Sequence, residues 1–286
     1  MDVLAIDIGG TKHSLALFRD ARLLRRESYP TDAAGGRSWM LDHLFRLFPK
    51  WLRSSAGLAA CGVGFGGPVD FALQRVSRSM HSGGWENFAL AGAIEKELGI
   101  PCWMDNDANL GALGEHRFGA GRGAGSLVYI TLSTGIGAGI LVDGKMVRGA
   151  DSLAGELGHV LLKEDGPLCS CGSRGCLEAL CSGQAIERSA GRPAAELLAD
   201  STFRPVYVSW LARGLRVPLL LLNPDRIIVG GGISKAGSAF FDDVRAELRR
   251  QMPASLPVRI DLRPAALGDD SVLWGARELA RENLKQ

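Results

Sequence analysis

A histidine and three closely spaced cysteines stand out in residues 155–178, GELGHVLLKEDGPLCSCGSRGCLE. Cys169, Cys171 and Cys176 follow a C-x-C-x4-C pattern, and the glycines between them allow a loop tight enough to turn three thiolates toward one point. His159 supplies a fourth donor. A closed Cys3His set is typical of a structural zinc site. The sequence therefore predicts structural Zn²⁺ bound by His159, Cys169, Cys171 and Cys176.

A disulfide pair in a secreted protein is the alternative for these cysteines. The chain opens with MDVLAIDIGG, a strand pattern, and this stretch has neither the charged and apolar regions nor the cleavage site of a signal peptide. We therefore expect a cytoplasmic, reducing setting, in which cysteines bind metals more often than each other. Cys61, Cys102 and Cys181 lie in apolar stretches and are predicted to be core residues.

Glycine turns are the second feature with chemical potential. Residues 3–8 are expected to form a buried strand that ends at Gly9 and Gly10, and residues 14–18 a second strand, so the segment predicts a hairpin. Backbone amides in such a turn can bind an anion. A strand instead of a helix follows the turn, which excludes a P-loop. A plain hairpin without a ligand is the alternative for this segment alone.

A second copy of this pattern strengthens the phosphate-binding interpretation. Residues 128–142, VYITLSTGIGAGILV, repeat strand, glycine turn and strand at an offset of 124 residues, the distance from Leu4 to Val128. The economical explanation is an internal duplication. Two such turns can hold a nucleoside triphosphate from both sides of a cleft. We therefore predict an α/β protein with the actin-like, ribonuclease H-like ATPase fold, built from two duplicated domains around a cleft.

Polar residues gather after another predicted strand. Residues 59–65 are expected to form a strand that ends at Gly66-Gly67-Pro68, and residues 89–98 a helix closed by glycine. The next strand runs into an acidic and amide-rich cluster, DNDAN at 105–109, before a helical segment. Capping of that helix is the simple interpretation. Several polar groups at the carboxyl end of a strand, however, mark the place where doubly wound folds bind ligands, so a functional role is predicted for Asp107.

The rest of the chain supports a two-domain soluble protein. Its 286 residues are 46% hydrophobic and 22% charged, with a net charge of +2 and scattered basic residues, so a nucleic-acid footprint is not visible. We expect an N-terminal domain at 1–118, a larger C-terminal domain at 119–270, a hinge in GAGRGAG at 119–125 and a final helix at 271–286 that packs back onto the first domain.

Two further segments carry expectations. Residues 206–222 are predicted to form an apolar helix with Pro218 as a kink or break, and no apolar run approaches the length of a membrane span. After a strand, the glycines at 230–232 leave room for a flat ring, as an adenine or ribose site requires, although close packing would also explain them.

Together these motifs, in this order, resemble the ROK family of sugar kinases and sugar-responsive repressors over nearly the whole chain. The resemblance is carried by DIGGTK (7–12), NDAN (106–109), TLSTGIGAGI (131–140), ELGH (156–159), CSCGSRGCLE (169–178) and VGGGIS (229–234).

The resemblance implies specific roles. Asp107 matches the catalytic aspartate that accepts the proton of a sugar hydroxyl. Matches to sugar-binding positions are Gly67, Asn106, Asp107, Glu156, His159 and Glu178. Matches to the phosphate-binding turns are Gly9, Gly10, Thr11, Lys12, Thr134, Gly135 and Gly137. Asp7 matches a position toward the magnesium ion, and Gly231 and Gly232 match the adenosine side. One nitrogen of His159 would then bind zinc while the other faces a sugar hydroxyl.

Three departures from the family pattern affect the substrate. The segment SMHSGGW places His81 where family kinases carry a sugar-binding asparagine. The segment Gly66-Gly67-Pro68-Val69-Asp70 lacks the glycine that follows proline in the family pattern. Residues 183–205, between the cysteine loop and the following helix, are fewer than the family pattern leads us to expect. The sugar is therefore left open by the sequence.

The resemblance implies an ATP- and Mg²⁺-dependent hexose kinase acting on the 6-hydroxyl of glucose or of an N-acetylhexosamine, forming a homodimer without nucleic-acid or membrane partners. Alternatives are a sugar sensor of the same family without efficient kinase activity, polyphosphate as phosphoryl donor, and an actin-like ATPase that binds no sugar. A family repressor would carry a helix-turn-helix domain ahead of DIGGTK, which begins at Asp7.

Overall fold

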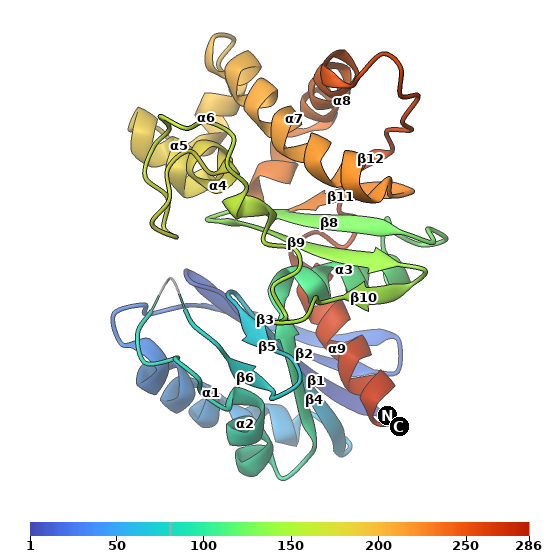
Figure 1. Cartoon of the computed structure of the whole chain (residues 1–286). Coiled ribbons are helices and arrows are strands. Elements are labelled where there is room, and N and C mark those ends of the chain that lie inside the picture. The colour runs from blue at the N-terminus through green and yellow to red at the C-terminus, as the bar shows by residue number, and fades with distance from the viewer. Residues whose placement is uncertain (80–81, 286) are drawn as a thin grey trace. The chain divides into compact units, whose positions relative to one another are not determined.

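The computed structural model describes residues 1–79 and 82–285, and its chain divides into two compact units (Figure 1). The first unit comprises residues 1–114, 148–153 and 270–286. The second unit comprises residues 115–147 and 154–269. The chain thus enters the second unit after residue 114 and returns to the first unit for the six residues 148–153. It then re-enters the second unit and ends in the first unit, at residues 270–286.

The first unit is built on a mixed sheet with strand order β3-β2-β1-β4-β7. Antiparallel pairing joins β1 to β2 and β2 to β3, as expected for hairpins, while β4 and β7 run parallel to β1. The strands are β1 (Asp2–Ile8), β2 (Lys12–Arg19), β3 (Arg22–Pro30), β4 (Leu58–Phe65) and β7 (Cys102–Asn106), with a short hairpin of β5 (Val69–Asp70) and β6 (Arg75–Val76) beside them.

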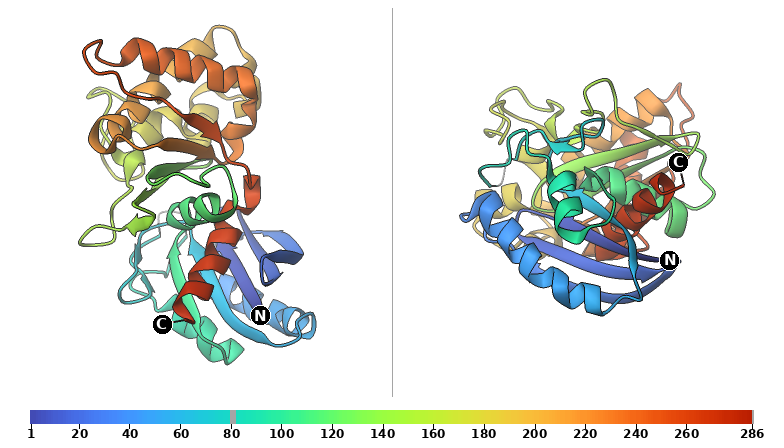
Figure 2. Two further views of the ribbon diagram at one scale, coloured as in Figure 1. Left: turned by 90° about the vertical axis from the view of Figure 1, so that its right-hand side faces the viewer. Right: turned by 90° about the horizontal axis from the view of Figure 1, so that it is seen from below.

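Helices cover both faces of this sheet. The helices α1 (Gly36–Arg53) and α2 (Leu90–Leu98) bury apolar residues against one face. The helix α9 (Ser271–Asn283) lies on the other face, against β1 and β4 (Figure 2). Its backbone comes so close that a Cβ atom on Gly62 would lie 1.9 Å from the carbonyl oxygen of Ala276. The helix α3 (Asp107–Phe118) follows β7 directly.

The second unit is built on a sheet with the same pattern, in the order β10-β9-β8-β11-β12. Here β8 and β9 form the antiparallel hairpin, β10 continues it, and β11 and β12 are parallel to β8. The strands are β8 (Leu127–Leu132), β9 (Ile136–Val142), β10 (Lys145–Val147), β11 (Arg226–Gly230) and β12 (Leu262–Pro264). The order of strands therefore matches between the two sheets position by position.

Helices of the second unit bury the apolar face of its sheet. The long helix α7 (Phe203–Leu222) packs against α8 (Ser238–Gln251), and both contribute to one apolar core with β8 and β11. The other helices are α4 (Leu177–Cys181), α5 (Gly183–Ala190) and α6 (Ala194–Ala199), with 3-10 turns at Leu157–His159, Gly232–Ala236 and Gly268–Asp270.

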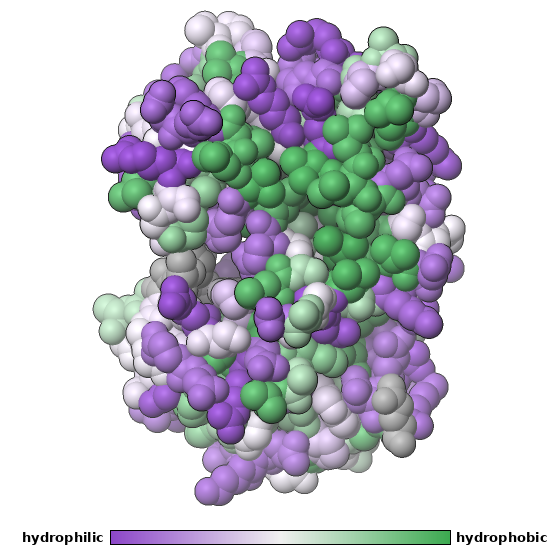
Figure 3. All heavy atoms as spheres, in the orientation of Figure 1, coloured by the Kyte–Doolittle hydropathy of each residue, from purple (hydrophilic) through white to green (hydrophobic). Residues whose placement is uncertain are grey.

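Two features differ from the sequence expectations. The helix α7 begins at Phe203 and continues through Pro218, so of the predicted kink or break at this proline, the break is wrong. By length and composition alone α7 could cross a membrane, so the expectation that no segment is apolar enough was also wrong. Within its apolar window 44% is buried in the second unit, and core helices of soluble proteins have the same length and composition. Apolar side chains also remain on the surface in Figure 3, and the end of α7 exposes Leu220, Leu221 and Leu222.

The helix α1 was missed by the sequence analysis. Its buried residues Met40, Leu44, Phe48 and Trp51 have the spacing of an amphipathic helix. The interior Pro49 and the glycines at its start obscured that pattern, because proline removes a hydrogen-bond donor from a helix.

Candidate active site and metal centre

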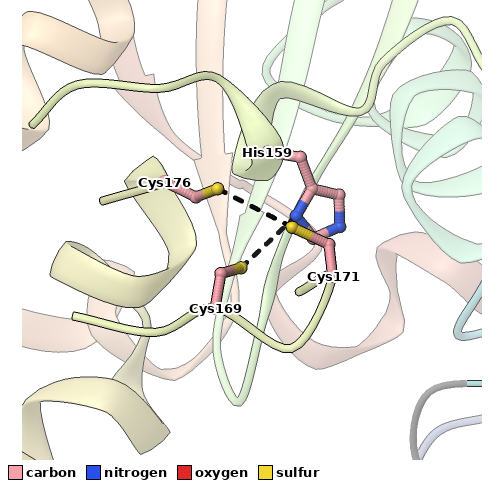
Figure 4. A group of neighbouring side chains, drawn as sticks. All are labelled: His159, Cys169, Cys171 and Cys176. Carbon is pink, nitrogen blue, oxygen red and sulfur yellow. Dashed lines mark hydrogen bonds between the residues drawn. The ribbon is translucent and has the colours of Figure 1, made fainter. Parts of the chain in front are cut away.

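His159, Cys169, Cys171 and Cys176 lie together in the second unit (Figure 4). Each offers one ligand atom, and the four atoms all lie within 4.8 Å of one another. The Sγ atoms of Cys171 and Cys176 are 3.7 Å apart, and Sγ of Cys169 lies 3.6 Å from Nδ1 of His159. The donors therefore converge on one point, as the spacing predicted.

These distances fit zinc. Tetrahedral zinc with Zn–S bonds of about 2.3 Å and Zn–N bonds of about 2.0–2.1 Å places two sulfur ligands about 3.8 Å apart and a sulfur and a nitrogen about 3.6 Å apart. The distances of 3.7 Å and 3.6 Å in this cluster agree with both values. Cysteine and histidine donors are also the chemistry that zinc prefers.

Local backbone geometry brings the cysteines together. Gly172 and Gly175 have φ values of 91° and 67°, in the left-handed region that favours glycine. A Cβ atom on Gly175 would lie 1.6 Å from the carbonyl oxygen of Lys163, so a side chain there would break the loop. The backbone N–H of Ser173 lowers the pKa of Cys171 to about 7, which favours the thiolate that a metal needs.

The other ring nitrogen of His159 faces a carboxylate. Its Nε2 atom lies 3.6 Å from Oε2 of Glu156, so the ring presents one nitrogen to the cysteines and the other to Glu156. Burial, with a smaller contribution from Glu178, raises the pKa of Glu156. A metal on Nδ1 would fix the ring and leave Nε2 as a hydrogen-bond donor.

Glu178 connects the cysteine loop to the second glycine turn. Its Oε2 atom accepts a hydrogen bond from the backbone N–H of Ile136 at 2.9 Å, and its Oε1 atom accepts one from the hydroxyl of Ser170 at 2.8 Å. Gly135 lies against this carboxylate, because a Cβ atom there would lie 2.7 Å from Oε2 of Glu178 and the end of that side chain would have to shift. The structure thus brings Glu178 and Gly135 together.

The remaining predicted residues of the second unit lie at the carboxyl ends of β8 and β11 or nearby. Thr134 lies in the turn between β8 and β9, whereas Gly137 is inside β9 and pairs with Thr131. Gly231 and Gly232 follow β11, and a Cβ atom on Gly231 would lie 2.5 Å from the carbonyl oxygen of Leu132 at the end of β8.

In the first unit, the other candidate residues lie where the neighbouring strands β1, β4 and β7 end. The loop after β4 meets the turn after β1, because the N–H of Gly66 donates to the carbonyl oxygen of Ile8 at 2.9 Å. A Cβ atom on Gly66 would lie 3.6 Å from both Oδ2 of Asp107 and the Cα atom of Gly9. The Gly9-Gly10 turn, the Gly66-Gly67 loop and Asp107 therefore adjoin one another.

Asn106 and Asp107 begin the helix α3. The Oδ1 atom of Asn106 accepts from the N–H of Ala108 at 2.9 Å, and its Nδ2 atom donates to the carbonyl oxygen of Gly67 at 3.0 Å. The capping interpretation is thus correct for Asn106. Asp107 is half-buried, and its Oδ1 atom accepts from the N–H of Ala108 at 2.8 Å.

The other predicted residues of the first unit surround the first glycine turn. Asp7 pairs with Ser14 on β2, Thr11 is exposed, and Lys12 begins β2. A small pocket beside this turn is lined by residues that include Gly9, Gly10, Gly66, Ser79, Ser82 and Trp85. His81, which was predicted to influence the sugar, lies outside the described residues.

Sequence reasoning did not find Ser170, the partner of Glu178, or Arg148, whose guanidinium contacts the carboxylate of Asp105. Arg148 had no sequence signal, because a single arginine in a loop is ordinarily a solvated charge. Ser170 stands between two cysteine ligands, and this position was an available signal.

The chain belongs to the ROK family, whose model matches residues 3–283. It is 32% identical to the glucokinase of Thermotoga maritima, over 99% of this chain and 98% of the relative. It is 30% identical to an N-acetylmannosamine kinase of Salmonella heidelberg, over 98% of this chain and 99% of the relative.

Among solved structures, the chain resembles a ROK family glucokinase from Streptomyces griseus in complex with glucose and AMPPNP. The TM-score is 0.86 at 30% identity, covering 99% of this chain and 100% of that chain. ROK family structures have the actin-like ATPase fold, and the mixed α/β architecture of this chain agrees. The predicted family is therefore confirmed, and so is the predicted actin-like α/β fold, whereas the duplication of two domains around a cleft remains a prediction.

Proposed function

We propose that this protein is an ATP-dependent sugar kinase that phosphorylates a hexose hydroxyl, the 6-hydroxyl of glucose or of an N-acetylhexosamine. One observation carries the proposal. In a member of the ROK family, the carboxylate of Asp107 stands at the start of α3 beside the two glycine segments that follow β1 and β4. A general base next to phosphate-binding backbone is what transfer of a phosphoryl group to an alcohol requires.

Asp107 is the proposed catalytic residue. Its carboxylate accepts the proton of the sugar hydroxyl as the hydroxyl oxygen bonds to the γ-phosphorus, and the bond from that phosphorus to the β–γ bridging oxygen breaks to release ADP. The transition state is loose, so positioning and neutralisation of phosphate charge contribute most of the rate. General-base assistance contributes about 100- to 10,000-fold.

Phosphate contacts are assigned to the two glycine turns. Backbone amides at Gly9 and Gly10, with Thr11 and Lys12, and the turn at Thr134 and Gly135 are proposed to bind the phosphates of ATP. Gly137 of the same hairpin is also assigned to the phosphates, Gly231 and Gly232 are proposed on the adenosine side, and Asp7 toward Mg²⁺. The magnesium ion would supply charge neutralisation for the β- and γ-phosphates.

Sugar contacts are assigned to Gly67, Asn106, Glu156, His159 and Glu178. The pair of Glu156 and Nε2 of His159 offers an acceptor and a donor 3.6 Å apart, a suitable arrangement for adjacent sugar hydroxyls. Zinc takes no part in the transfer in this proposal, and its role is to hold the ring of His159 and the loop that carries Ser170.

A coupled ADP-release assay tests substrate and donor together. Purified protein is supplied with ATP and Mg²⁺ and a panel of hexoses and N-acetylhexosamines, and the panel is repeated with polyphosphate while sugar phosphate is detected directly. We expect ATP-dependent turnover with glucose or an N-acetylhexosamine. Absence of sugar-dependent transfer with either donor would overturn the proposal and favour the sugar-sensor alternative.

Further proposals concern organisation. The matching strand orders of the two sheets support the predicted duplication. The domain boundary at residue 118, the hinge at 119–125, the cytoplasmic location and the homodimer remain predictions. Sedimentation of the purified protein would measure its oligomeric state.

A further inference from the structure

Asp105 is a buried carboxylate placed two residues before the proposed base. Only 3% of its side chain is exposed, and it ends β7 directly before Asn106. A carboxylate in such a position needs partners, because burial of an unpaired charge is costly.

The two oxygens of Asp105 have different partners. Oδ1 accepts hydrogen bonds from the backbone N–H of Asn106 at 2.8 Å and from Nδ2 of Asn109 at 2.9 Å. Oδ2 accepts a hydrogen bond from Nε of Arg148 at 2.9 Å, and Nη2 of the same guanidinium lies 2.8 Å from Oδ2 in an ion pair. One oxygen thus holds the turn that carries Asn106 and Asp107, and the other holds Arg148.

Asn109 depends on the same carboxylate. Its Oδ1 atom is buried without a hydrogen-bond partner among the described residues, so the bond from Nδ2 to Asp105 is what orients its side chain. The first turn of α3 is therefore held from both sides of Asp107, at Asn106 and at Asn109.

Arg148 is itself held in place by the first unit. Its Cζ atom lies 3.6 Å from the centroid of the Phe71 ring, which is a close cation–π contact. Four residues later in the 148–153 segment, Ser152 accepts a hydrogen bond from the N–H of Phe71 at 3.3 Å. The segment is thus attached to the first unit at both ends, and the chain continues from Leu153 toward Glu156.

We propose that Arg148 is a positioning residue for phosphoryl transfer, which acts through Asp105 to fix the carboxylate of Asp107. This inference rests on the proposed kinase function, and deepens it by naming a residue that acts on the proposed base without contacting substrate. Arginine is required because its fork places two nitrogens within 2.9 Å of one carboxylate oxygen while its flat face contacts Phe71, and lysine cannot do both.

Loss of Arg148 leaves the charge of Asp105 buried without its cation. The carboxylate then shifts toward water, and the turn held by Oδ1 shifts with it. A displacement of about 1 Å of a catalytic group can cost about 100-fold in rate. The sugar contacts assigned to Glu156, His159 and Glu178 do not involve this carboxylate, whereas the contact assigned to Asn106 depends on the turn that it holds.

The test compares Arg148→Ala, Arg148→Lys and Arg25→Ala. Arg25 is a matched control, because it also pairs with a carboxylate, Glu27, and lies over an aromatic ring, Trp51, in the same unit. We expect Arg148→Ala to lower kcat by about 10- to 100-fold and to raise the equilibrium Kd for sugar by a smaller factor, since only the contact of Asn106 is disturbed, and Arg148→Lys to lie between it and the unmodified protein. Arg25→Ala is expected to keep kcat within about twofold, since the side chain of Arg25 contacts Glu27, Ser54 and Trp51, none of which is assigned to the active site.

Chemical rescue and hydrogen exchange separate positioning from general destabilisation. Millimolar methylguanidinium is expected to restore part of the kcat of Arg148→Ala in a saturable manner, while ethylammonium at equal ionic strength is not. Amide exchange at Asn106, Ala108 and Asn109 should accelerate in Arg148→Ala and remain unchanged in Arg25→Ala.

The outcomes distinguish the two proposals. If the unmodified protein shows no sugar-dependent transfer, the kinase proposal fails, and exchange at these three amides still tests the role of Arg148. Unchanged exchange, or an unchanged kcat in Arg148→Ala of an active protein, would overturn the inference. A parallel loss of kcat, sugar affinity and melting temperature without rescue would also overturn it, because it would show a purely structural role.

Discussion

The carboxylate of Glu178 accepts a hydrogen bond from the backbone N–H of Ile136 at 2.9 Å, which fastens the helix after the cysteine loop to the second glycine turn. Both segments are thereby fixed relative to each other within the second unit. Glu178, which is assigned to the sugar, and the turn at Gly135, which is assigned to the phosphates, are joined by this hydrogen bond. A change in either one should therefore affect the binding of both the sugar and ATP.

A methyl group at Gly135 tests this bond. In Gly135→Ala the new Cβ atom would lie 2.7 Å from Oε2 of Glu178, so this oxygen has to shift, and we expect its hydrogen bond from Ile136 to weaken. Hydrogen bonds to charged groups contribute about 1.5–3 kcal/mol, which corresponds to a fall of about tenfold or more in kcat/KM for the sugar and for ATP. Steady-state kinetics with each substrate varied in turn would measure it.

Gly92→Ala is the control for this substitution. Gly92 is exposed in α2, and a Cβ atom there meets nothing within 4 Å. Its kinetics should match those of the unmodified protein, and its free energy of unfolding should rise by about 0.5–1 kcal/mol because alanine favours the helix. Unchanged kinetics in Gly135→Ala would show that the shared bond is unimportant for either substrate.

Replacement of Asp107 separates chemistry from binding. Asp107→Ala is expected to lower kcat by about 100- to 10,000-fold, because the sugar hydroxyl loses its proton acceptor. The Kd for sugar, measured by calorimetry, should change little, since other residues are assigned to the hydroxyls. Near-normal turnover in this variant would remove Asp107 from the catalytic role.

Loss of zinc should weaken sugar binding and stability together. Cys171→Ser removes one of four donors, and we expect less than stoichiometric zinc by elemental analysis, a lower melting temperature and a higher Kd for sugar. Chelation of the unmodified protein should produce the same changes. Cys61→Ala, at a buried cysteine on β4, should retain its zinc. Unchanged sugar affinity in zinc-free protein would contradict the proposed role of the loop.

Acid should destabilise the first unit through His13. The ring is buried, its Nδ1 atom lies 3.1 Å from the hydroxyl of Thr31, and burial, with a smaller contribution from His43, lowers its pKa from 6.5 to about 4. The unfolded chain therefore binds more protons than the folded chain between pH 6.5 and about 4, and the free energy of unfolding falls as pH falls through this window.

The size of this effect can be measured by urea denaturation. His13 should cost about 2 kcal/mol at pH 5 relative to pH 7. In His13→Gln the difference between the two pH values should shrink by about this amount, whatever the variant's stability at pH 7. An unchanged pH dependence would show that His13 does not titrate in the folded protein as its burial implies.

Local sequence patterns predicted the parts of this protein that depend on near neighbours. The zinc ligands could be named because three of them lie within eight residues, so one loop with two left-handed glycines suffices to bring their sulfurs together. The paired glycine hairpins were visible for the same reason, since a strand, a tight turn and a second strand form from adjacent residues.

Tertiary structure decided the rest, because pairing between distant segments leaves no local trace. Gly9, Gly66 and Asp107 meet because β1, β4 and β7 are parallel neighbours whose carboxyl ends share one edge. Glu178 finds Ile136 across 42 residues, and Arg148 finds Asp105 across 43. The sequence by itself determined which groups could do chemistry, and only the packing of strands and loops determined which of them hold one another in place.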